Sequence, residues 1–306
     1  MFRKPRTLGV SLLQGRIQMA EVEHGRTVQV SALLEGETTT DFSQAAAQLS
    51  PDHPQLDVFV NELRSLLKNH RLMPDQISFA LPANPLFINL IPVDATLAGP
   101  SLKTHLAWEL SQYYPEGDPK DFILGSSIIP SADGGPNQAF MVGLPRGLVG
   151  FVQKAASALK MKMLIIDVDQ FSVEKTVLVN YPEILDHAIV LFGMRSGAVD
   201  ASLIHEGRMT DYRMYAMDPS TDPTWAIYAY LHYLEDRGIP QPAALILHGV
   251  DIRKDLLATV RKETGIKQTV ALNAVRKLPV AKSVHAPFLK ESHRFGAAIG
   301  LALRTQ

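Results

Sequence analysis

Residues 8–33 read LGVSLLQGRIQMAEVEHGRTVQVSAL, and residues 189–215 read IVLFGMRSGAVDASLIHEGRMTDYRMY. Both stretches begin with an apolar run, pass through a tight polar turn, continue as an alternating run, and turn again at a glycine before a third run. Alternation of this kind predicts β-strands, and short polar turns between such runs predict antiparallel hairpins. Because the pattern occurs twice in one chain, the sequence favours a duplicated architecture.

Helical periodicity lies between and after these two stretches. The apolar side chains of residues 56–67 and 148–159 recur at spacings of three and four, which predicts amphipathic helices. Further helices are expected at 225–233, 256–260 and 292–303, and strands at 77–81, 87–91, 139–144, 164–168 and 244–247. Strands and helices therefore alternate, which is typical of the α/β class.

Composition narrows the class of protein further. The chain has 306 residues, which favours two domains, and its net charge of −1 gives no general attraction to nucleic acid or membrane. There are no cysteines, so disulfides, thiolate metal sites and a cysteine nucleophile are excluded.

The apolar run at 8–13 follows basic residues but lacks a cleavage site, and no run reaches the ~18 residues of a membrane span. We expect a soluble, cytoplasmic protein.

One segment departs from this neutrality. Residues 253–294 contain ten Lys or Arg against three acidic residues. Such a run is explained either by a solvated helix face and loop, or by contact with anionic lipid or an acidic partner. The second interpretation predicts weak adsorption to anionic vesicles that fades as salt is added.

Motifs for other chemistry are weak. The ten histidines form no H-E-x-x-H or H-x-H pattern, and Ser-x-x-Lys occurs three times, so its presence carries no information. Asp167 and Asp169 are placed on one face of a strand, where they could bind a metal ion or have a structural role near a cleft. No P-loop, dinucleotide-binding glycine pattern or nucleic-acid signature is present, and we expect neither a metal site nor nucleic-acid binding.

Five segments together resemble a known family, the PilM type IV pilus assembly proteins, which are related to the cell-division protein FtsA and more distantly to actin. The similar segments are the opening hairpin at 8–21, the Trp108-Glu109 segment running to Asp121, residues 164–169, residues 247–250, and the ending Phe295-Gly-Ala-Ala-Ile-Gly-Leu-Ala-Leu-Arg304.

This resemblance implies an actin-like fold, that is, two ribonuclease-H-like domains in one chain. Residues 1–81 and 145–185 would form the first domain (1A), with residues 82–144 inserted as a 1C-like subdomain. Residues 186–306 would form the second domain (2A). Its 2B subdomain would be reduced or missing, because only a short linker separates Met217 from Trp225.

The same resemblance identifies where an actin-like protein would hold Mg-ATP, and this chain departs from the pattern there. Each phosphate hairpin needs an Asp to orient metal or water, and small residues that let backbone N–H groups reach phosphate oxygens. The residues at these places, together with the glycine turn near the nucleoside, are Ser11, Leu13, Gln18, Leu191, Gly193, Gly249 and Val250. Leucine cannot coordinate magnesium-bound water, so we expect no catalysis and no ATP or magnesium as cofactor.

The function implied by the resemblance is a non-catalytic scaffold of a type IV pilus or related inner-membrane complex. It would be cytoplasmic and peripheral at the inner membrane, would bind the cytoplasmic N-terminal tail of a PilN-like bitopic membrane protein, and could contact other pilus components. The tail would lie in a groove between 1A and 1C, for which the sequence suggests Leu81, Pro82, Phe87, Leu144 and Pro145. Core packing is the other interpretation of these five residues.

Three alternatives remain open at this point. One is the cytoplasmic domain of a GspL-like type II secretion protein, which has the same kind of fold. Another is an actin-like protein that binds and hydrolyses ATP with a rebuilt site. The third is a peptide-binding adaptor unrelated to pili that shares only the fold.

Overall fold

A computed structural model of the chain describes residues 4–304, apart from residues 14, 116, 132–134 and 219–220. The expected turn residue Gln14 and parts of the 131–137 and 218–224 loops lie outside the described residues. No helix in the described part of the chain is both long enough and apolar enough to span a membrane.

The first sheet has five strands in the order β3-β2-β1-β4-β8. The strands are β1 Arg6–Leu13, β2 Arg16–Glu23, β3 Gln29–Glu37, β4 Gln76–Leu81 and β8 Lys162–Val168. The first three form the predicted antiparallel meander, and β4 and β8 then add in parallel. Helices α1 (Leu56–Asn69) and α3 (Arg146–Ala158) bury their apolar stripes against one face of this sheet.

The second sheet repeats this order as β11-β10-β9-β12-β13. Its strands are β9 Ile189–Arg195, β10 Ala198–His205, β11 Arg208–Ala216, β12 Ala244–Gly249 and β13 Gln268–Ala271. Helices α5 (Thr224–Asp236) and α6 (Lys254–Thr264) cover one face, where Phe192 packs edge-on against Tyr230. The duplicated α/β architecture that the two hairpin patterns predicted is therefore confirmed.

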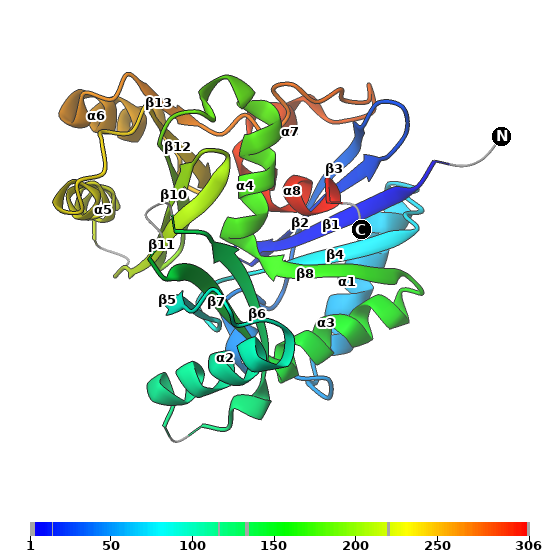
Figure 1. Ribbon diagram of the computed structural model, residues 1–306. Helices are drawn as coiled ribbons and strands as arrows, with labels where there is room; N and C mark the ends of the chain where they lie inside the picture. Colours follow the sequence, from blue (N-terminus) through cyan, green and yellow to red (C-terminus); the bar gives the residue numbers. More distant parts are fainter. Residues whose placement is uncertain (1–3, 14, 116, 132–134, 219–220, 305–306) are drawn as a thin grey trace.

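A third, smaller sheet is inserted between β4 and β8 of the first one (Figure 1). Its antiparallel strands, in the order β5-β7-β6, are β5 Phe87–Val93, β7 Asn137–Pro145 and β6 Phe122–Ile129. Helix α2 (Gly99–Tyr113) covers one face through Leu106 and Leu110. Strands β5 and β6 are the edges of this sheet, and the side chains of β6 are mostly exposed.

Two helices cross between the large sheets: α4 (Asp169–Asn180) and α8 (Gly296–Ala302) (Figure 1). The short helix α7 (Ala286–Lys290) precedes α8. Glycine lets α8 approach its neighbours closely, because a β-carbon on Gly300 would lie 1.8 Å from the carbonyl oxygen of Ser172 in α4. A β-carbon on Gly9 of β1 would lie 1.9 Å from the carbonyl oxygen of Ala298. The glycines of the C-terminal segment thus serve packing.

The structure corrects two expectations about single elements. Asp167 and Asp169 do not share a strand face, because β8 ends at Val168 and Asp169 is the first residue of α4. The helix expected over 292–303 is divided into a 3-10 turn, Ser292–Phe295, and α8.

Candidate functional site

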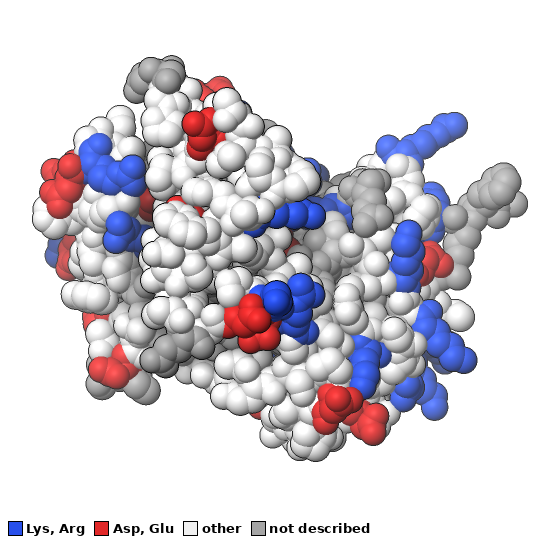
Figure 2. Space-filling model, turned by 60° about the horizontal axis from the view of Figure 1, so that its bottom comes forward, with Lys and Arg blue, Asp and Glu red and all other residues white. Residues whose placement is uncertain are grey.

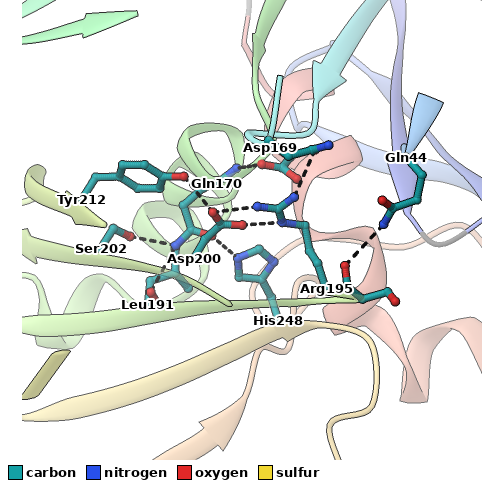
Figure 3. Close-up of polar contacts among 11 residues, drawn as sticks. Gln44, Asp169, Gln170, Leu191, Arg195, Asp200, Ser202, Tyr212 and His248 are labelled. Carbon is teal, nitrogen blue, oxygen red and sulfur yellow. Dashed lines mark hydrogen bonds and ion pairs between the residues drawn. The ribbon is translucent and has the colours of Figure 1, made fainter. Parts of the chain in front are cut away.

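The candidate site lies between the two large sheets, where the first hairpin of the second sheet and the start of α4 meet the end of β12, and we call this place the cleft. Contacts cross this cleft from both sides: the Gln44 side-chain nitrogen donates to the backbone oxygen of Ser196 at 3.4 Å, and Arg195 donates to the Asn84 side chain at 3.4 Å. Figure 3 shows that the polar side chains of the cleft point toward one another. The geometry of this cluster decides what the cleft can bind.

In the described part of the first hairpin, Ser11 and Gln18 stand at the positions that the resemblance gives to the phosphate-site Asp and Lys. Ser11 and Gln18 lie opposite each other on β1 and β2, and both are buried. The Gln18 amide donates to the Glu35 carboxylate at 3.1 Å, and that carboxylate is also paired with Arg16 at 2.6 Å and Arg294 at 2.7 Å. Gln18 therefore stands where a phosphate-binding lysine would be needed, and the two nearest cations, Arg16 and Arg294, are already paired with Glu35.

The second hairpin is filled by side chains. Leu191 is completely buried in the sheet core, whereas an actin-like ATPase would need a carboxylate there. At Gly193 an added β-carbon would lie 2.5 Å from the Gln170 side-chain oxygen and 2.9 Å from His248 Nε2. The space that glycine leaves open is thus occupied by these two side chains, and no phosphate oxygen can enter it.

Gly249 is retained for a structural reason. Its φ of +100° is in the range that favours glycine, and an added β-carbon would lie 2.1 Å from the backbone oxygen of Met194. Val250 follows as a buried residue whose N–H donates to the same Met194 oxygen at 3.0 Å. The glycine turn therefore closes against β9.

Gln170 is the centre of the buried polar cluster (Figure 3). Its side-chain nitrogen donates to the backbone oxygen of Leu191 at 3.1 Å and to the Ser202 hydroxyl at 2.9 Å. Since both amide hydrogens are committed, the Gln170 oxygen accepts from His248 Nε2 at 2.7 Å. This assigns the proton of the neutral imidazole to Nε2, and burial lowers the pKa of His248 to about 3.

Arg195 and Asp200 form the charged half of the cluster. The guanidinium binds both carboxylate oxygens of Asp200, at 2.5 and 2.9 Å, and the Tyr212 hydroxyl donates to the same carboxylate at 2.7 Å. Burial, reinforced by the charge of Asp200, raises the pKa of Tyr212 well above its ordinary value, so the hydroxyl keeps its proton. The arginine is neutralised inside the protein by Asp200 and is not available for a phosphate.

Asp169 lies buried beside this pair. Burial, opposed by the charge of Arg195 and reinforced by that of Asp200, raises the pKa of Asp169 to about 7. One of its carboxylate oxygens accepts the backbone N–H of Gln170 at 2.7 Å. Among the described residues no group of three or more His, Asp or Glu side chains is arranged to hold a metal ion.

A cavity of about 560 Å³ remains beside the second hairpin, between the 217–224 connection and the start of α6. Its polar rim carries more acids than bases: Asp218, Asp222, Asp251 and Asp255 against Arg195 and Arg253. Arg195 is committed to Asp200, and Arg253 lies 3.7 Å from Asp255. The rim therefore carries a net negative charge, which repels the phosphates of a nucleoside triphosphate that is not neutralised by a metal ion.

The five residues that the sequence suggested for a partner groove lie at the junction between the first sheet and the insert, but most are packed inside. Leu81 is completely buried in the first core, and Pro82 and Phe87 are also buried. Leu144 and Pro145 are half-buried at the end of β7. These positions follow the core-packing interpretation more closely than that of an open wall.

An open groove does exist nearby, at the free edge of β6. A cavity of about 220 Å³ lies where the insert meets α4 and the β10–β11 turn. Its apolar lining is Ile128, Ile129, Phe140, Phe171 and Met209, and the rings of Phe140 and Phe171 lie 5.6 Å apart. Its polar lining is Ser127, Asp167, Glu174, Arg208 and Arg304. Arg304 is paired with Asp167 and donates to the backbone oxygen of Phe171 at 2.8 Å.

The sequence indicates the backbone of the cleft but not most of the side chains that fill it. Gln170, Asp200 and Tyr212 carry no functional signal in the sequence, because a lone polar residue in a strand or helix gives no sign of being buried. Arg195 and His248 stand out only as turn neighbours.

The sequence and the structure of the chain were compared with those of known proteins. No protein-family model matches the chain, and no curated protein matches it in sequence. Its structure is similar to that of a PilM–PilN type IV pilus biogenesis complex, with a TM-score of 0.81 and 16% identity over 97% of this chain and 98% of that chain. It is also similar to a Bacteroides thetaiotaomicron protein with an actin-like ATPase fold and unknown function, with a TM-score of 0.53 and 14% identity over 89% and 92% of the chains.

A third neighbour is the cytoplasmic domain of EpsL, an inner-membrane component of the type II secretion system of Vibrio cholerae, with a TM-score of 0.45 and 12% identity over 88% and 98% of the chains. That likeness is too distant to carry an argument. The first two likenesses confirm the actin-like fold, and the structural resemblance to PilM that the sequence suggested is confirmed with it.

Proposed function

We propose that this chain is a non-catalytic scaffold of an inner-membrane type IV pilus assembly complex, and that it binds the cytoplasmic tail of a PilN-like bitopic membrane protein. The observation that carries the proposal is the structural likeness to PilM over almost the whole chain, combined with a nucleotide cleft filled by the protein's own side chains. In this proposal the protein is cytoplasmic and is held at the inner membrane by its partner.

The non-catalytic part of the proposal is supported by the cleft. Leu191 is part of the hydrophobic core, Gln170 and His248 occupy the space beside Gly193, and Asp200 neutralises Arg195. Restoring a phosphate site would require several simultaneous changes, because each of these side chains satisfies another. ATP and magnesium are therefore not cofactors in this proposal.

The tail is proposed to bind along β6 and into the groove at its end. Strand β6 has a free edge in the three-stranded sheet, so an extended segment can add to it through backbone hydrogen bonds. Apolar side chains of the tail would enter between Ile128, Phe140 and Phe171. The charged rim supplied by Glu174 and Arg208 would fix the direction of the tail.

Two isoleucines of β6 provide a matched test. Ile128 lines the groove and is 40% exposed, whereas Ile123 is 37% exposed on the same strand and does not line it. Calorimetric titration of a PilN-like tail peptide should show saturable binding to the wild-type protein. Ile128→Glu should weaken it at least tenfold, since a buried charge at an apolar contact costs about 2 kcal/mol or more. Ile123→Glu should bind as the wild type does. No binding of the peptide by the wild type, or equal loss in both variants, contradicts the proposal.

A further inference from the structure

The strands β1, β4 and β8 all begin at the same end of the first sheet, and this end lies away from the cleft. The register shows this directly, because Thr7 pairs with Gln76, and Gln76 pairs with Lys162. The β2–β3 turn reaches the same edge, since Glu23 at the end of β2 pairs with Arg6. The C-terminal ends of α1 and α3 also lie there, as Arg64 of α1 donates to the backbone oxygen of Ala158 at 3.3 Å.

Five exposed cations gather at this end of the domain, and we call them the basic edge: Arg26, Lys68, Arg71, Lys160 and Lys162. Within the described residues no ion pair joins any of them to an acid. The neighbouring Glu23 is already paired with Lys4 and Arg6, and Asp75 accepts the backbone N–H of Arg6 at 3.1 Å. Figure 2 shows Lys and Arg side chains gathered along its right-hand side, where Figure 1 has the beginnings of β1 and β4.

Two of these cations occupy positions where glycine would be less strained. Arg71 and Lys160 follow the ends of α1 and α3 with φ of 54° and 58°, in the left-handed region. Each helix ends with the same pair of hydrogen bonds: Leu72 N to Leu67 O with Arg71 N to Lys68 O, and Met161 N to Ala156 O with Lys160 N to Ser157 O. Both helices thus carry a basic residue where backbone energetics favour glycine, which the folding of the helix ends does not explain.

We infer that the basic edge lies against the anionic headgroups of a lipid bilayer. The cations are spread along the width of a five-stranded sheet, roughly 20 Å at the usual strand spacing, and none of them lines the cleft cavity or the groove at β6. The basic edge faces outward and lies away from both the cleft cavity and the groove at β6. Such an array matches the flat layer of anionic lipid headgroups better than it matches the surface of a folded acidic protein. Met73, which is 69% exposed between Arg71 and β4, adds an apolar side chain to the same surface.

The run at 253–294 is a weaker candidate for this contact. Several of its cations are already paired within the protein: Arg276 and Lys277 with Glu183, and Arg294 with Glu35. Lipid contact through the basic edge goes beyond tail binding and does not depend on it, because the groove at β6 uses none of the five cations.

Arg71 and Lys160 allow a test in which a loss of adsorption to vesicles cannot be caused by unfolding of the protein. The double variant R71G/K160G removes two charges and relieves two left-handed side-chain positions, so its thermal midpoint should be equal to or higher than that of the wild type. Adsorption is measured by co-sedimentation of the full chain with vesicles of phosphatidylglycerol and phosphatidylethanolamine. The variant's partition coefficient should fall about 25-fold, which is about fivefold for each cation removed near an anionic surface.

A matched control removes two exposed cations elsewhere. K254Q/K262Q changes α6 by the same charge and should retain most of the adsorption. Adsorption of the wild type should also fall steeply between about 50 and 300 mM salt and be absent on phosphatidylcholine vesicles, as Debye screening requires of a contact between exposed charges. Equal loss in both double variants, adsorption to neutral vesicles, or binding to poly-glutamate without adsorption to lipid would overturn the inference.

Discussion

At the scale of the residue, the cleft contains two buried groups whose protonation acts in opposite directions. The pKa of His248 is lowered from 6.5 to about 3, so the folded state loses stability as pH falls from about 6.5 toward 3. The pKa of Asp169 is raised from 3.8 to about 7, so the folded state gains stability as pH falls from about 7 toward 3.8. In the wild type these two contributions largely cancel between about pH 4 and 6.5.

Substituting either group should remove its own contribution from the pH dependence of the wild type. In Asp169→Asn the change in the free energy of unfolding from pH 8 to pH 5 should be more negative than in the wild type by about 3 kcal/mol, because the gain from Asp169 is lost. In His248→Gln the same change should be more positive than in the wild type by about 2 kcal/mol, because the loss from His248 is removed. Urea unfolding at the two pH values measures both differences. Equal pH dependence in the two variants would show that these groups are not both buried in the folded state.

At the scale of the element, the crossing of α4 and α8 fixes how the two sheets are joined. Helix α4 is buried on several sides, and Ser172, Thr176 and Asn180 are among its buried residues. Their polar groups bond to nearby backbone: the Thr176 hydroxyl donates to Gly296 O at 2.7 Å, and the Asn180 amide donates to Ala274 O at 3.0 Å. Because α4 has no single apolar stripe, the 3.6-residue period that reveals α1 and α3 is missing from its sequence.

The close approach of α8 makes Gly300 sensitive to substitution. In Gly300→Ala the new methyl group would lie 1.8 Å from the Ser172 carbonyl oxygen, so the helices must separate. We expect a loss of about 3 kcal/mol in the free energy of unfolding. Gly125→Ala on β6 is the control, because nothing lies within 4 Å of the position that its β-carbon would take, and it should change stability by less than about 0.5 kcal/mol. Thermal unfolding compares the two, and a tolerated Gly300→Ala would mean that the two helices cross less tightly than these distances require.

At the scale of the whole molecule, the two halves meet across a cleft that the protein fills itself. Gln170 from α4 binds His248 and Ser202 of the second sheet, and Arg195 of that sheet reaches Asn84 beside the insert. These side chains link the parts of the molecule that a bound nucleotide joins in an actin-like ATPase. These contacts between the two halves are made by the protein's own side chains.

This arrangement predicts that Mg-ATP does not bind. Calorimetric titration of Mg-ATP into the purified protein should give no saturable heat, and the thermal midpoint should not move, while an actin-like ATPase measured in parallel should show both. The physical reason is the filled space at Gly193 together with the acidic rim of the remaining cavity. Saturable micromolar binding would favour the alternative of a rebuilt ATP site.

The sequence alone determined the duplicated strand pattern and the two amphipathic helices that pack on the first sheet. These follow from local periodicity and from residue types, which do not depend on distant contacts. Three features depend on tertiary packing and could not be predicted. Gln170, Asp200 and Tyr212 meet Arg195 and His248 in the cleft. Leu81 is buried while β6 offers the open groove, and cations from separate segments form the basic edge. The reason is that burial and charge proximity depend on which elements pack together, and residues far apart in the chain carry no local sign of it.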